Sequence, residues 1–105
     1  MFLNDWSDSG FNGMCRDFQI HGGALEGATV LLASYTYENY SGAAFVLFEK
    51  DGTLFEVNGS HCSCYGLEDQ WEPEETSEEA LLARDWYPDY GGALKSLLEQ
   101  VLASR

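Results

Sequence analysis

Residues 43–57 have the sequence AAFVLFEKDGTLFEV, in which two apolar runs flank the dipeptide Asp51-Gly52. Asp-Gly between apolar runs is the strongest short-range signal for a tight hairpin, because both central residues of a type I′ turn need positive φ. The stretch therefore predicts an antiparallel β-hairpin over about residues 43–57.

The first strand of this hairpin is apolar on both faces. Because side chains alternate along a strand, Phe45 and Leu47 lie on one face. The other face carries Ala44, Val46 and Phe48. This pattern is typical of a central strand that is covered on both sides, here by a helix and by the N-terminal segment.

The chain before the hairpin predicts a further strand and an N-terminal arm. Residues 29–37 (TVLLASYTY) are rich in β-branched and aromatic residues and favour a strand. Residues 15–20 (CRDFQI) fit either a first strand or a helical turn. Residues 1–13 combine polar turn-formers with scattered aromatics. This composition predicts an irregular arm that packs large side chains on the core, with a short helix as the alternative.

The chain after the hairpin predicts two helices. Thr76 and Glu79 stand at the spacing of a capping box and favour a short helix over residues 77–84. Residues 93–103 carry an apolar stripe at helical spacing, which predicts an amphipathic helix packed on a sheet. The stripe consists of Leu94, Leu97, Leu98, Val101 and Leu102.

These elements define an α+β fold class. We expect a small, mainly antiparallel β-sheet with a central hairpin (43–57), packed against one or two C-terminal helices (77–84 and 93–103). The length of 105 residues and the 45% hydrophobic composition indicate a single domain over residues 1–105.

The charge restricts the classes of partner. Eighteen Asp and Glu residues against five Lys and Arg give a net charge of −13. Nucleic acid and anionic membranes repel such a chain, so neither is expected to bind directly. A basic protein surface would attract it, although the same charge could serve only solubility.

The cysteine content and the N-terminus indicate a cytoplasmic protein. Three cysteines are an odd number, and the start MFLNDWSDSG has neither the basic nor the apolar region of a signal peptide. No apolar run approaches the roughly 20 residues that cross a bilayer. We therefore expect reduced thiols.

A candidate metal site lies at residues 61–64. His61, Cys62 and Cys64 are potential zinc ligands, and Cys15 or His21 could complete the set. The C-x-C spacing is tighter than the usual zinc pair, so the alternative is two structural thiols packed in the sheet. A nucleophilic cysteine is disfavoured, because the surrounding negative charge raises a thiol pKa. No cofactor is expected unless this cluster binds zinc.

The densest acidic run lies at residues 68–79, where seven of twelve residues are Asp or Glu and none is basic. Carboxylates on a folded scaffold can imitate a nucleic-acid backbone and occupy a groove lined by Lys and Arg. The candidate contact residues are Glu68, Asp69, Trp71, Glu72, Glu74 and Glu75. The alternative is that Trp71 belongs to the core and that the last glutamates only favour a helix start. No carboxylate of the run is singled out as a catalytic group.

The middle of the chain resembles a known protein family. The motif EVNGSHCSCxGLExQWxPEET, formed by residues 56–76, is similar to one in a family of small, functionally uncharacterised proteins of bacteriophages and prophages. The resemblance also includes YExYSGxAFVL at residues 37–47. It implies an accessory protein that acts on host machinery, with inhibitors of CRISPR or restriction nucleases prominent among the strongly acidic examples.

These observations favour a non-enzymatic inhibitor of a bacterial defence nuclease complex in the host cytoplasm. The inhibitor would bind, as a monomer or a small homo-oligomer, to a basic surface that normally holds nucleic acid. A small zinc- or thiol-dependent protein centred on the His-Cys-Ser-Cys cluster is the first alternative. An oligomeric assembly protein is the second, because both faces of residues 43–48 are apolar.

Overall fold

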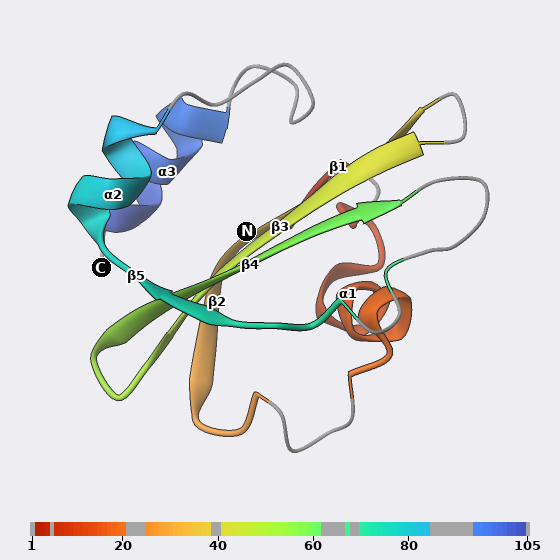
Figure 1. Ribbon diagram of the computed structural model, residues 1–105, viewed down its shortest axis with the longest axis horizontal. Helices are drawn as coiled ribbons and strands as arrows, with labels where there is room; N and C mark the ends of the chain where they lie inside the picture. Colours follow the sequence, from red (N-terminus) through yellow and green to blue (C-terminus); the bar gives the residue numbers. More distant parts are fainter. Residues whose placement is uncertain are drawn as a thin grey trace.

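The computed structural model describes residues 2–4, 6–20, 25–38, 41–61, 67, 70–84 and 94–104. Its strands form one five-stranded sheet in the order β1-β2-β3-β4-β5 (Figure 1). The strands are β1 (Phe2–Asn4), β2 (Ala28–Glu38), β3 (Ser41–Lys50), β4 (Thr53–His61) and β5 (Glu74–Thr76). The helices are α1 (Gly10–Phe18), α2 (Glu78–Ala83) and α3 (Leu94–Ala103). The predicted α+β class is confirmed.

The predicted hairpin is formed by β3 and β4, which pair antiparallel in continuous register from Gly42↔His61 to Lys50↔Thr53. At the turn Asp51 has a φ of 54° and Gly52 a φ of 80°. Positive φ at both residues is the requirement of a type I′ turn, so the local signal is confirmed. The hairpin is longer at both ends than the predicted range of 43–57.

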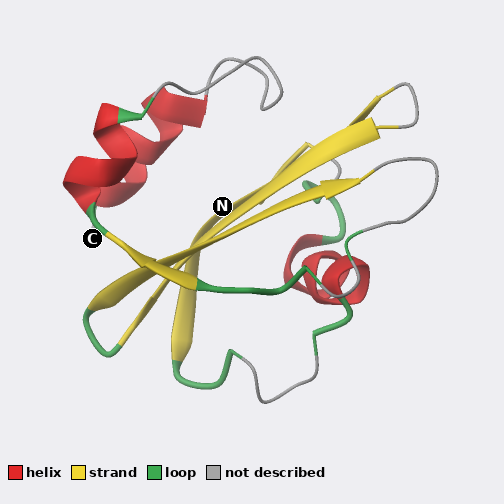
Figure 2. Cartoon of the chain, in the orientation of Figure 1, coloured by secondary structure: helices red, strands yellow, loops and turns green. Residues whose placement is uncertain are grey.

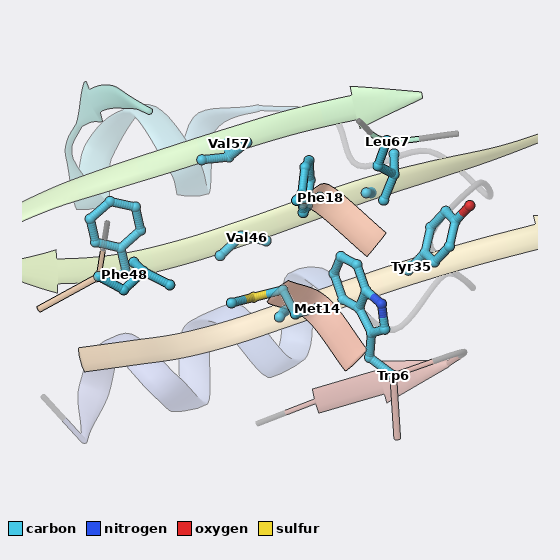
Figure 3. Close-up of a cluster of buried hydrophobic side chains, with 11 residues drawn as sticks. Trp6, Met14, Phe18, Tyr35, Val46, Phe48, Val57 and Leu67 are labelled. Atoms are coloured by element: carbon cyan, nitrogen blue, oxygen red, sulfur yellow. The ribbon is translucent and has the colours of Figure 1, made fainter. Parts of the chain in front are cut away.

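The sheet is covered on both faces, as the alternation in β3 predicts. Helices α2 and α3 lie together on one face, and α1 lies on the other (Figure 2). The α2/α3 face buries a leucine-rich cluster of Leu32, Phe45, Leu47, Leu54, Leu81, Leu94, Leu98 and Leu102. The α1 face buries a more aromatic cluster, which includes Trp6, Met14, Phe18, Tyr35, Val46, Phe48, Val57 and Leu67 (Figure 3).

The N-terminal segment is not the predicted irregular arm, and helix α1 agrees instead with the alternative of a short helix. Strand β1 adds to the sheet edge parallel to β2, with Phe2 opposite Ala33, and helix α1 starts within the predicted arm, at Gly10. Trp6 is fully buried between them, and its Nε1–H donates to Asp17 at 2.7 Å. A three-residue strand has no periodicity of its own, and the glycines disfavour a helix locally, so tertiary packing decides both elements.

The C-terminal helices follow the sequence prediction closely. In α3, Leu94, Leu98 and Leu102 are buried and Leu97 and Val101 are partly buried, which confirms the apolar stripe. None of the helices in the described part of the chain is long and apolar enough to span a membrane.

The N-cap of α2 is displaced by one residue from the predicted capping box. Ser77 is extended, and its side chain accepts a hydrogen bond from the Ala80 N–H at 3.2 Å. Thr76 cannot act as this cap, because it already belongs to β5, opposite Leu54.

Candidate functional site

Three of the predicted contact glutamates lie on the last strand and on the segment before it. Glu72, Glu74 and Glu75 are exposed, and Glu78 and Glu79 are exposed on the first turn of α2. We call these five residues the β5–α2 acidic surface. Glu68 and Asp69, the other two predicted carboxylates, lie outside the described residues.

The pairing of β5 with β4 sends neighbouring glutamates to opposite sides of the sheet edge. Glu74 stands opposite Glu56 and Glu75 stands opposite Phe55. Because cross-strand partners share a face, Glu74 lies on the α2/α3 side and Glu75 on the α1 side. The acidic surface therefore wraps around the edge instead of forming one flat face.

Trp71 occupies the position that the core alternative predicts. Its ring is partly buried, with its centroid 5.2 Å from that of Phe18 in an edge contact and 5.9 Å from that of Phe48 in a stacked contact. Trp71 thus fixes the segment before β5 to the aromatic cluster. The role of Trp71 as a contact residue for a partner stays a prediction.

A partly buried ion pair lies beside the surface, and the sequence prediction missed it. Glu56 on β4 is only 4% exposed, and its Oε2 accepts from an Arg84 guanidinium nitrogen at 2.8 Å. The Asn58 side-chain amide donates to the other carboxylate oxygen, also at 2.8 Å. Burial alone would raise the pKa of Glu56, but hydrogen bonds from Arg84, Thr76 and Asn58, together with the Arg84 charge, outweigh burial and lower the pKa.

Two sequence signals point to this pair in retrospect. Glu56 interrupts an otherwise apolar strand, TLFEV, and Arg84 is the sole Lys or Arg between Asp51 and Leu94. A charged side chain in a buried strand needs a partner of opposite charge.

The surface contains two adjoining depressions along β5. The larger, of about 620 Å³, is lined by Glu56, Glu74, Glu75, Thr76, Ser77, Ala80 and Arg84. The smaller, of about 270 Å³, is lined by Gly52, Thr53, Leu54, Glu75, Thr76, Ser77 and Glu78. Among the described residues that line either depression, Arg84 is the one cation, and it pairs with Glu56. Among the described lining residues, carboxylates therefore outnumber cations.

The predicted metal cluster falls almost entirely outside the described residues. Cys62 and Cys64 are not described, and His61 is placed only by its backbone, which ends β4 opposite Gly42. Within the described residues, no three His, Cys, Asp or Glu side chains gather at one point to hold a metal ion. The zinc hypothesis therefore stays a prediction.

Cys15 does not have the environment of a nucleophile. This thiol is partly buried on α1, and burial raises its pKa. A raised pKa lowers the fraction of thiolate, which is the reactive species.

The arrangement holds exposed carboxylates on a strand and on a capped helix start, next to the Arg84–Glu56 ion pair. Comparisons of the chain with models of protein families, with curated proteins and with solved structures found no match.

Proposed function

We propose that this protein is a non-enzymatic inhibitor that binds a basic protein surface through the β5–α2 acidic surface and thereby excludes nucleic acid from it. The exposure of five glutamates on a folded edge carries the proposal. The resemblance to phage accessory proteins directs the search for the partner to defence nuclease complexes of a bacterial host.

The folded scaffold supports this function better than a flexible acidic tail would. Glu74 and Glu75 are held by pairing with β4, and Glu78 and Glu79 by the first turn of α2. Carboxylates that are ordered before binding lose less conformational entropy when they meet a partner's Lys and Arg side chains. Their fixed spacing also selects among basic surfaces.

The alternative of an oligomeric assembly protein relied on the two apolar faces of β3. Both faces are buried within the folded protein, by α2 and α3 on one side and by α1 on the other, so they do not offer a surface for self-association. In the described part of the chain, Phe11 is the one large apolar side chain that is exposed.

Charge reversal tests the proposal. The tagged protein is used to capture partners from a susceptible bacterium, and binding of the identified partner is then measured with the wild type and with E72K/E74K/E75K. We expect the triple variant to lose at least about 100-fold in affinity, because three attractive contacts become repulsive. Wild-type binding should also weaken steeply with rising salt.

A matched variant separates the surface from net charge. D8K/E26K/E99K makes the same change in net charge at exposed residues outside β5 and α2. This control should bind within about threefold of the wild type, since long-range attraction alone is screened. Equal losses in both variants, or no loss in the first, would contradict the proposal.

A further inference from the structure

Strand β5 is one of the two edges of the sheet. It pairs with β4 on one side, and no other described strand pairs with its outer side. An open edge presents backbone N–H and C=O groups that an extended chain can use.

The register identifies the backbone groups that face outward. In a two-residue hairpin the residues that flank the turn, Lys50 and Thr53, form a hydrogen-bonded pair, and bonding then alternates along β4. Thr53 and Phe55 therefore bond to β3, whereas Leu54 and Glu56 bond to β5. Their partners on β5, Thr76 and Glu74, therefore direct their backbone N–H and C=O groups to β4. The backbone N–H and C=O groups of Glu75 point away from the sheet.

An observed contact farther along β4 supports this alternation. Ser60 has the same parity as Leu54 and Glu56, and its N–H and C=O both bond to the Gln70 side-chain amide, each at 2.7 Å. Gln70 lies where the continued register would place the partner of Ser60. Its amide closes this part of the β4 edge, and the outer edge of β5 stays open among the described residues.

The charges on the edge select its occupant. A second copy of this chain would bring glutamates against glutamates, and like charges directly opposite one another destabilise strand pairing. A strand that carries Lys or Arg would instead be attracted to Glu74 and Glu75.

The two depressions provide room for the side chains of such a strand. Both run along β5 and share Glu75, Thr76 and Ser77 in their lining. Side chains of an added strand alternate about its axis. Those on the Glu74 side would lie at the larger depression, which also exposes part of the Arg84–Glu56 pair.

We propose that the partner adds an extended Lys- or Arg-rich strand to the free edge of β5, with the Glu75 backbone bonding to it and the flanking glutamates pairing with its cations. This inference rests on the proposed function and specifies how the same surface recognises its partner.

The test compares two substitutions at one position. The probe is a synthetic peptide of alternating Lys and Thr, titrated into the wild type, E75Q and E75P. E75Q removes the charge and keeps the outward N–H, and we expect it to weaken binding about twofold. E75P removes the N–H as well, and we expect about a further tenfold loss. In the wild type the Glu75 amide should gain hydrogen-exchange protection when the peptide binds.

A modified peptide gives a second measurement that does not depend on the folding of E75P. N-methyl groups on two consecutive central residues block both edges of the peptide and leave its charge unchanged. We expect this peptide to bind the wild type about tenfold more weakly than the parent peptide. Equal affinity of the two peptides, or failure of the parent peptide to bind, overturns strand addition.

The two proposals fail in different ways. If E75P matches E75Q while E72K/E74K/E75K still loses its partner, recognition is by charge without strand pairing, and the proposed function stands. If E72K/E74K/E75K keeps its partner, the proposed function itself is wrong.

Discussion

Glu56 shows how one residue ties the acidic surface to the fold. It lies almost fully buried on β4, directly opposite Glu74, where two carboxylates would repel each other. Arg84, which is 28 positions away in the sequence, supplies the compensating charge and links the end of α2 to the sheet. The pair therefore positions α2, whose first turn carries Glu78 and Glu79.

Removal of the guanidinium should destabilise the protein. R84A leaves the buried Glu56 carboxylate without its cation, and we expect the free energy of unfolding to fall by about 2 kcal/mol at neutral pH. The loss is smaller than for a fully buried pair, because the Arg84 side chain is 37% exposed. Urea denaturation followed by circular dichroism measures it.

The pH dependence gives a second signature of the same pair. Because the folded protein lowers the pKa of Glu56 below its ordinary value of 4.5, this group adds stability above that pH and loses its contribution as the pH falls further. Wild type and R84A should thus converge in acid. R16A is the control, since the Arg16 side chain is 73% exposed and lies 3.7 Å from Asp17. It should change stability by less than about 0.5 kcal/mol, and an equal effect of both substitutions would refute the assigned role of Arg84.

At the scale of elements, β4 organises both the fold and the surface. It forms the hairpin with β3 through a local turn signal, and its other side receives β5. Gly59 on β4 also allows a close approach, since an added Cβ would lie 3.1 Å from Leu67 and 3.3 Å from Phe18. The α1 side of the sheet is therefore packed tightly at Gly59.

The hairpin turn offers a test of purely local chemistry. At Gly52 the φ of 80° is strained for a side chain, but an added Cβ would meet nothing within 4 Å. G52A should therefore cost about 1–2 kcal/mol through backbone strain alone, measured by urea denaturation. D51N serves as the control, because Asn tolerates positive φ, and it should change stability by about 0.5 kcal/mol at most. A G52A variant with the same free energy of unfolding as the wild type would argue against the type I′ turn.

At the scale of the whole molecule, two apolar clusters hold together a chain with a net charge of −13. The clusters lie on opposite faces of one sheet, so β2, β3 and β4 contribute to both. Burial of apolar surface stabilises the fold, whereas the excess of carboxylates destabilises it through mutual repulsion. The same excess provides the attraction for a basic partner.

Salt should consequently act in opposite directions on stability and on binding. Raising NaCl from low to about 0.5 M screens the internal repulsion, and we expect the melting temperature to rise by about 5 °C while partner binding weakens. Differential scanning calorimetry measures the first effect. D8K/E26K/E99K, which is less negative by six charges, should show a smaller rise. A melting temperature that falls with salt would show that screened ion pairs outweigh the repulsion.

The features that depend on neighbouring residues could be predicted from the sequence. Asp51-Gly52 specified the hairpin through φ, the apolar alternation of β3 predicted a sheet covered on both faces, and the stripe from Leu94 to Leu102 predicted α3. The sequence also located the acidic run, because a cluster of Asp and Glu can be recognised without knowledge of the fold.

The features that depend on distant partners could not be predicted from local sequence and became apparent in the folded structure. β1 forms because Phe2–Asn4 finds β2, and β5 because Glu74–Thr76 finds β4. Trp71 turned inward onto Phe18 and Phe48, and Glu56 became a buried, paired carboxylate through Arg84. Three-residue strands and single buried charges have no local periodicity, so their free energy comes from contacts that the chain makes only after it has folded.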